Sequence, residues 1–227
     1  MAHPDDAELY AGGTIARLLA QGLEVRIVKT TAGDRGSRQE KISQQDLKEL
    51  RLKEDQAAMQ ELGIDPSNSV NLEFEDGRVE NSHETISGLA QQIRLFQPDL
   101  IITHNSEDVI IRFQAGVSWV NHRDHRNTGL SAIDAAYPYS RDLLFFPEQL
   151  EGNATSHTCT EFLLVDYYDH PDVVCIDVTE FLAKRISAHA KHASQYPLTK
   201  AQESADFFTK FEGVARRYER FRYVLTD

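Results

Sequence analysis

The chain has 227 residues, of which 41% are hydrophobic and 26% charged, and its net charge is -12. This profile is typical of a soluble globular protein, and the length suits one domain with a sizeable core. The negative net charge argues against nucleic acid or an anionic membrane surface as a partner, because both bind basic faces.

Membrane and export signals are not expected. No window approaches 18 uncharged apolar residues, so the sequence predicts no membrane span. The N-terminus lacks the basic and apolar regions of a signal peptide. The two cysteines, Cys159 and Cys175, are too few for a disulfide framework. We therefore predict a cytoplasmic protein with free thiols.

Helical and strand patterns alternate along the chain. Apolar runs typical of strands cover residues 24–31, 70–74, 99–104, 161–165 and 173–178. Helical periodicity covers residues 8–21, 45–62, 84–96, 126–136 and 179–192, with a last helix near 200–218. The alternation favours a mostly parallel sheet covered by helices, in which ligands bind beyond the carboxyl ends of the strands. Residues 106–120 lack a clear period and predict a long functional loop.

Two polar clusters have the residue types of a metal site, namely HPDD at residues 3–6 and NHRDH at residues 121–125. A catalytic zinc ion takes three ligands of the His, Asp or Glu type and keeps one position for water. Each cluster adjoins a predicted helix start. Taken alone, each pattern leaves an ordinary alternative open, because HPDD also suits a turn and HxxH also occurs as a plain pair of histidines.

Taken together, the clusters and several other segments resemble the PIG-L/LmbE family of zinc-dependent deacetylases. The segments follow the family's order: AHPDDAELYAGGTIARLLAQG at 2–22, TAGDRGS at 31–37, LRLKEDQAAMQELGI at 50–64, QPDLIITH at 97–104, NHRDHRNTG at 121–129 and DVTEFLAKRISAHAKHASQ at 177–195. The resemblance implies an α/β fold of Rossmann-like, three-layer type, formed by a single domain over residues 1–227. It also implies hydrolytic deacylation of an N-acetylglucosaminyl compound or a related N-acyl amine.

The resemblance also implies a metal site and a proton acceptor. His3, Asp6 and His125 would bind one Zn²⁺ per chain. Asp5 would be the general base toward the metal-activated water. This chemistry is sound, because zinc lowers the pKa of bound water to roughly 7 and a carboxylate within hydrogen-bond reach can then accept the proton.

The second cluster would complete the reaction. His122 would stabilise the oxyanion and help to protonate the leaving amine, since a protonated imidazole suits developing negative charge. Asp124 would orient a histidine of the pair. His104, at the end of a predicted strand, is a candidate for a supporting role.

Four further residues are candidates for contacting the substrate: Arg51, Asp76, Arg141 and His192. The ordinary alternatives stay open at this stage. Arg51 also suits a helix arginine paired with Glu54 or Asp55. Arg141 also suits a loop surface charge, and His192 a histidine at a helix end.

The start of the chain departs from the family pattern. In the family, the first motif follows a buried apolar strand at the centre of the sheet, whereas only Met1 and Ala2 precede His3 here. We therefore expect the first central strand to be missing, which would loosen His3 and Asp6. An N-terminally extended chain is expected to bind zinc more tightly.

Two other functions suit the same residue types. A metal-dependent phosphoesterase would use the same His and Asp residue types, but it favours more carboxylates bridging two metal ions. A non-catalytic relative would bind a sugar without hydrolysis, and the joint presence of Asp5, Asp6, His122 and His125 argues against it. The expected partner is a small N-acyl amino sugar or a similar amide, with homo-oligomers allowed by analogy to relatives.

Overall fold

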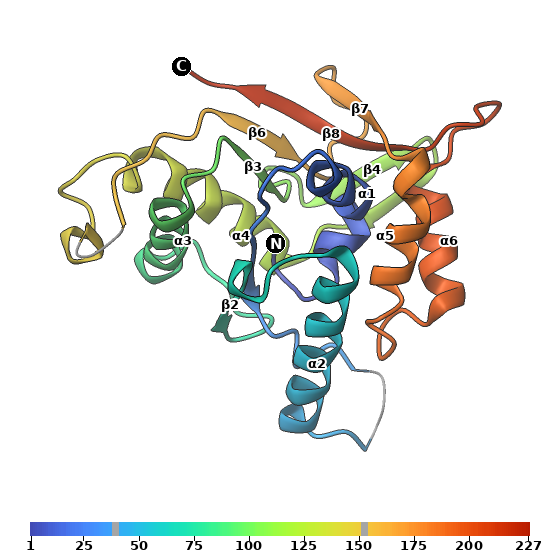
Figure 1. Ribbon diagram of the computed structural model, residues 1–227, viewed down its shortest axis with the longest axis horizontal. Coiled ribbons are helices and arrows are strands. Elements are labelled where there is room, and N and C mark those ends of the chain that lie inside the picture. The colour runs from blue at the N-terminus through green and yellow to red at the C-terminus, as the bar shows by residue number, and fades with distance from the viewer. Residues whose placement is uncertain (38–40, 151–153) are drawn as a thin grey trace. The chain divides into compact units, whose positions relative to one another are not determined.

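The computed structural model describes residues 1–37, 41–150 and 154–227 (Figure 1). The chain forms two compact units. Unit 1 contains residues 77–174 and 221–227 together with Met1, and unit 2 contains residues 2–76 and 175–220. Among the described residues, no helix combines the length and apolar character that a membrane span needs.

Unit 2 is built from helices around a short parallel strand pair. Its helices are α1 (Asp6–Ala20), α2 (Gln44–Leu62), α5 (Leu182–His189) and α6 (Leu198–Thr209). Its strands β1 (Ile27–Thr31) and β2 (Ser69–Phe74) run parallel, with Ile27 opposite Ser69. Helix α2 begins where the Ser43 side chain accepts the Asp46 N–H, and it ends at Gly63, whose φ of 92° is left-handed.

Helix α1 approaches the C-terminal helices of unit 2 closely, as Figure 1 shows for α1 in blue and α5 and α6 in orange. A Cβ at Gly12 would lie 2.9 Å from Arg185 Cγ, and one at Gly13 would lie 2.6 Å from Val178 Cβ. The two glycines therefore allow a contact distance that any side chain would prevent. This contact fixes the helix whose first turn follows the HPDD cluster.

Unit 1 contains the remaining helices α3 (His83–Phe96) and α4 (Arg123–Asp134) and the greater part of a four-stranded sheet. The sheet order is β3-β6-β8-β7, formed by β3 (Leu100–Thr103), β6 (Glu161–Leu164), β8 (Tyr218–Leu225) and β7 (Val173–Asp177). Strand β3 runs parallel to β6, and β8 runs antiparallel to β6. A separate hairpin pairs β4 (Ile110–Gln114) with β5 (Val117–Val120).

The five strands predicted from apolar runs are all confirmed, within a few residues, as β1, β2, β3, β6 and β7. Two predictions were wrong. The expected loop at 106–120 contains the β4–β5 hairpin, and the helix expected near 200–218 ends at Thr209 before β8 begins. Parallel pairing holds for β1–β2 and β3–β6, whereas β8 departs from the parallel pattern.

In the described part of the chain, no strand precedes α1. The Ala2 residue is fully buried, and its carbonyl accepts the Thr31 N–H at 2.9 Å. Ala2, just before the HPDD cluster, is therefore attached to the end of β1 by a main-chain hydrogen bond.

Candidate functional site

The HPDD cluster forms the turn that leads into α1 in unit 2. The Asp6 carboxylate accepts the His3 backbone N–H at 2.7 Å, and His3 Nδ1 lies 3.4 Å from Asp6 Oδ2. Asp5 and Asp6 are both buried. The turn therefore holds one imidazole and two carboxylates together in a largely water-excluded environment.

Asp76 lies on the other side of the His3 ring. Its Oδ1 is 3.3 Å from His3 Nε2, and its Oδ2 accepts the Arg35 backbone N–H at 2.8 Å. Burial raises the pKa of the Asp76 carboxyl, but the hydrogen bonds from His3 and Arg35 outweigh burial and bring the pKa to about 2. Asp76 is therefore anionic near neutral pH and holds the His3 ring in place within this unit.

Arg51 contacts the Asp5 carboxylate. Its Nη2 lies 3.1 Å from Asp5 Oδ2, and its Nη1 donates to the Gly33 carbonyl at 2.7 Å. Gly33 has a φ of +64°, and a Cβ there would lie 2.3 Å from Arg51 Nη1. Burial raises the pKa of the Asp5 carboxyl, and the neighbouring Asp6 carboxylate adds to this effect while Arg51 opposes it. Arg51 is thus a buried partner of Asp5 and not an exposed helix arginine.

His192 is fully buried in unit 2, with its Nε2 3.2 Å from Glu8 Oε1. Sequence reasoning missed Glu8, which is 1% exposed and lies in the first turn of α1. The signal was present in the sequence: Glu8 is a carboxylate on a helix face that is otherwise buried and mostly apolar. Such a residue rarely lies inside without a partner.

In unit 1, His122 is the N-cap residue of α4. Its Nδ1 accepts the Asp124 backbone N–H at 3.2 Å and lies 3.9 Å from Asp124 Oδ2. The Asp124 side chain is fully buried, and its two oxygens accept the N–H groups of Gly77 at 2.6 Å and Val79 at 3.1 Å. The buried carboxylate therefore fixes the 77–79 turn and lies beside the exposed His122 ring.

His125 stacks on the buried His104 ring at the end of β3, with ring centroids 4.1 Å apart and planes at 14°. The His122 ring lies 5.5 Å from that of His125. Close packing makes this possible, because a Cβ at Gly129 would lie 2.3 Å from the His104 carbonyl oxygen. Unit 1 therefore gathers three imidazoles where α4 begins.

Arg141 lies on an exposed part of unit 1. Its Nε donates to Asp142 Oδ1 at 2.8 Å, and its guanidinium carbon lies 4.4 Å from the centre of the Tyr137 ring. These contacts are those of a surface charge, and they leave the predicted contact with substrate untested.

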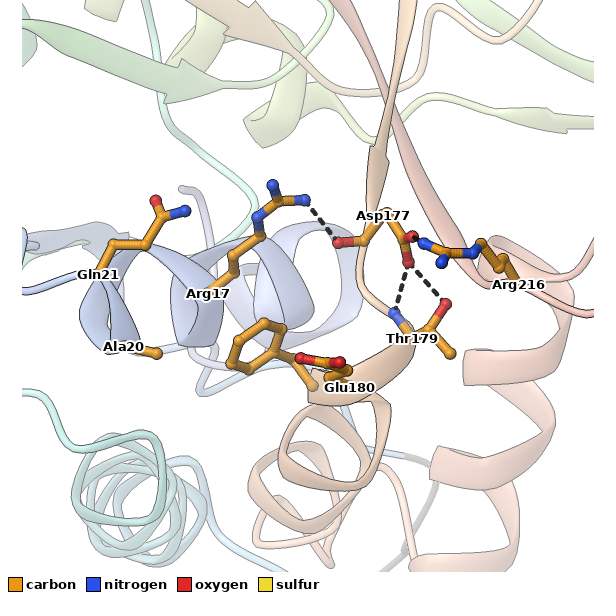
Figure 2. Close-up of a pocket in the computed structure, with 8 residues that line it drawn as sticks. Arg17, Ala20, Gln21, Asp177, Thr179, Glu180 and Arg216 are labelled. Carbon is orange, nitrogen blue, oxygen red and sulfur yellow. Dashed lines mark hydrogen bonds and ion pairs between the residues drawn. The ribbon is translucent and has the colours of Figure 1, made fainter.

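Unit 2 has a pocket of about 490 Å³. Figure 2 draws the residues that line it. Arg17 donates to the Asp177 carbonyl at 2.9 Å, and Arg216 pairs with the Asp177 carboxylate. The other lining residues are Ala20, Gln21, Thr179, Glu180 and Phe181. The lining contains none of the residues predicted for the site, so this pocket is separate from the predicted chemistry.

Comparison with known proteins tests the family that the motifs predict. The profile described as "PIG-L: GlcNAc-PI de-N-acetylase" matches residues 1–136. The chain is 24% identical over 195 residues to diacetylchitobiose deacetylase of Thermococcus kodakarensis, a match that covers 86% of this chain and 68% of the relative. It is 54% identical over 35 residues to 1D-myo-inositol 2-acetamido-2-deoxy-alpha-D-glucopyranoside deacetylase of Actinosynnema mirum, covering 15% of this chain and 12% of that protein.

Among solved structures, N,N'-diacetylchitobiose deacetylase from Pyrococcus horikoshii superposes with a TM-score of 0.81 and 28% identity. The superposition covers 98% of this chain and 81% of that one. The family, the α/β fold class and the amidohydrolase class predicted from the motifs are thereby confirmed. The identity of the metal and the role of each site residue stay predictions.

Proposed function

Because this chain belongs to the PIG-L family of GlcNAc-PI de-N-acetylases, we propose that it removes the acetyl group from an N-acetylglucosaminyl compound by hydrolysis. The observation that best supports this proposal is the geometry of the HPDD turn. A buried carboxylate held by an arginine adjoins a histidine and a second carboxylate, as a metal-assisted hydrolase requires. The names of the two deacetylase relatives favour an N-acetylated amino sugar as the substrate class.

We assign the metal to His3, Asp6 and His125, with one Zn²⁺ per chain. Two imidazoles and one carboxylate are the donor set of many catalytic zinc sites, and the burial of Asp6 suits a group that is neutralised by a cation. When bound, zinc would activate water and polarise the amide carbonyl. Asp76 would support this set by fixing the His3 ring.

Asp5 is our candidate for the general base. Burial raises the pKa of its carboxyl, which makes the carboxylate a better proton acceptor than an exposed one. The Arg51 contact at 3.1 Å holds the carboxylate in one orientation. We therefore propose that Arg51 positions Asp5 and does not contact the substrate.

His122 is our candidate for the acid that faces the substrate. Its Nδ1 accepts a backbone N–H, so the neutral ring has its proton on Nε2, the atom that we propose acts on the carbonyl oxygen and the leaving nitrogen. The buried Asp124 carboxylate, 3.9 Å from Nδ1, would help to orient the ring. Arg141 stays our candidate for polar groups of the substrate. A single domain over residues 1–227, a cytoplasmic location and homo-oligomers stay predictions.

The test combines metal analysis with amine release. Purified protein should contain one zinc per chain and release primary amine from N,N'-diacetylchitobiose or from an N-acetylglucosaminyl inositol. The Asp5→Asn variant should lose 10²- to 10⁴-fold in kcat, an order of magnitude typical for a general base. Asp169→Asn, an exposed aspartate 4.0 Å from Arg112, is the matched control and should retain full turnover.

Two results would overturn the proposal. Unchanged turnover in Asp5→Asn would remove Asp5 as the base. A chain that contains metal but releases amine from no N-acetyl sugar, while it cleaves p-nitrophenyl phosphate, would favour the phosphoesterase.

A further inference from the structure

The segment that follows α5 holds two helices of unit 2 at once. His192 contacts α1, because its Nε2 lies 3.2 Å from Glu8 Oε1 and both side chains are almost fully buried. Glu8 comes three residues after Asp5, so its position is about one helical turn from the proposed base.

Two residues further on, Ser194 contacts α2. Its backbone N–H donates to Glu54 Oε1 at 2.7 Å, and its hydroxyl donates to Glu54 Oε2 at 2.6 Å. Glu54 comes three residues after Arg51 and therefore lies one turn away on the same helix. Two hydrogen bonds to one carboxylate fix the orientation of that side chain better than a single bond can.

The helices that carry Glu8 and Glu54 also contact each other in the proposed site. Arg51 and Asp5 are joined at 3.1 Å, so α1 and α2 meet there as well as at the segment after α5. Burial lowers the pKa of the His192 ring, but the Glu8, Asp5 and Asp55 carboxylates outweigh burial and raise it. The His192–Glu8 contact is thus favoured as an ion pair in a site with little water.

We propose that residues 192–195 form a clamp in which His192 and Ser194 position Asp5 and Arg51 by holding Glu8 and Glu54. The catalytic role of Asp5 and Arg51, which the clamp would position, rests on the proposed function. The contacts that form the clamp do not depend on that function. Since His192 is fully buried and directed at Glu8, a positioning role replaces the contact with substrate that the sequence predicted.

The chain offers a matched control. His189 lies three residues before His192, is equally buried and lies against the Tyr196 ring, with centroids 4.2 Å apart and planes tilted by 37°. Neither of its ring nitrogens has a hydrogen-bond partner among the described residues. Replacing each histidine by phenylalanine therefore removes a buried imidazole in both cases, but it removes a hydrogen bond to α1 in only one.

The first experiment compares His192→Phe with His189→Phe. Loss of the clamp should lower kcat by 10- to 100-fold and weaken zinc binding by a similar factor, as for other residues that orient a metal site, while KM changes by less than about threefold. His189→Phe should change the melting temperature with kcat and zinc affinity close to wild type. His192→Gln, whose amide can still donate to Glu8, should recover part of the loss. Ser194→Ala tests the second contact in a variant that is expected to fold.

A second readout needs neither metal nor substrate. Hydrogen exchange in the apo protein, followed by mass spectrometry, should accelerate in the first turn of α1 for His192→Phe and not for His189→Phe. Equal exchange in the two variants would overturn the clamp. So would kcat and zinc affinity within twofold of wild type, and a raised KM with unchanged kcat would instead indicate a contact with substrate. Absence of amine release in the wild-type protein would count against the proposed function alone, because the exchange experiment still decides on the clamp.

Discussion

Arg185 in unit 2 and Arg94 in unit 1 are both fully buried, yet among the described residues only Arg185, which also donates to the Leu9 carbonyl, has a carboxylate among its acceptors. Arg185 Nε lies 3.0 Å from Glu219 Oε1, so that one buried charge faces another. In the described part of the chain, the hydrogen bonds of Arg94 go to uncharged oxygens. These are the carbonyls of Tyr139, Ser140, Asp142, Phe145 and Phe146 and the side-chain oxygen of Gln149.

The acceptors of each arginine indicate which part of the structure it stabilises. Glu219 also accepts the N–H groups of Gly13 at 2.8 Å and Thr14 at 2.7 Å, so the charge pair ties α1 to α5 and to β8. Arg94 instead donates to carbonyls of residues 139–146, a segment outside the β-ladders in which only some carbonyls also accept a main-chain N–H. The Arg185–Glu219 pair thus holds packed helices and a strand of unit 2 together. Arg94, which donates several hydrogen bonds, holds an irregular segment of unit 1.

The largest expected effect is that of Arg94→Met. Five main-chain carbonyls and one amide would lose a donor together. The carbonyls of Ser140, Asp142 and Phe146 keep a main-chain N–H donor, so the cost comes mainly from those of Tyr139 and Phe145, at about 1–3 kcal/mol for each group left unpaired. We expect the free energy of unfolding to fall by about 4 kcal/mol in urea titrations, with protease cleavage within residues 137–149. Arg94→Lys, with three donors, should lie between this variant and wild type. A loss below about 1 kcal/mol would show that water replaces the guanidinium without cost.

A smaller loss is expected for Glu219→Gln. It leaves the buried Arg185 without its carboxylate, a change that costs about 3 kcal/mol, at the lower end of the range for buried pairs. Burial raises the pKa of the Glu219 carboxyl, while Arg185 and the N–H groups of Gly13 and Thr14 oppose this shift. The double variant Arg185→Met/Glu219→Met should be more stable than the sum of its single variants predicts. Strict additivity in a double-mutant cycle would argue against a charge pair.

Acid should destabilise the protein through His189 of unit 2. Burial lowers the pKa of this ring to about 3 from 6.5, with Arg185 and His192 adding to the effect. Below pH 6.5 the His189 ring therefore binds a proton in the unfolded chain but not in the folded chain. The free energy of unfolding consequently falls as the pH drops. The slope approaches about 1.4 kcal/mol per pH unit, or roughly 1.5 kcal/mol between pH 6.5 and 5. His189→Phe should flatten the stability curve by this amount, and an unchanged curve would contradict the assignment.

The smallest effect is expected at the pocket of Figure 2, where the charge pair is exposed. Arg216 pairs there with Asp177, whose carboxylate also accepts the hydroxyl and N–H of Thr179. Exposed pairs contribute little, because water and salt screen them. Arg216→Ala should leave the melting temperature unchanged within error. A clear decrease would show that ion pairs of unit 2 stabilise it even at the surface.

The sequence predicted the fold best where the chain is regular and apolar. The runs at 99–104 and 161–165 became neighbouring parallel strands. Strand β8 escaped prediction because its alternation includes the buried Glu219, whose partner Arg185 cannot be seen in a local pattern. The hairpin at 110–120 escaped because its exposed positions include apolar residues such as Ile110 and Val120, which obscure the period of two.

In the candidate site too, some residues could be predicted from the sequence and others could not. The HPDD and NHRDH clusters could be found because their residues are adjacent in the chain. The contacts of His192 could not, since Glu8 lies 184 positions away and only the folded chain brings the two together. A motif identifies the groups that do chemistry, but the residues that hold them follow from tertiary packing.

The backbone at Gly33 limits how the protein can be redesigned. The loop 31–37 is an obvious place to vary for new substrates, yet a single methyl group at position 33 would occupy the space of the Arg51 guanidinium. It would also force a side chain into a left-handed backbone conformation. Libraries built on this loop should therefore keep position 33 constant, because a change there would displace the arginine that holds Asp5 before any new substrate contact could form.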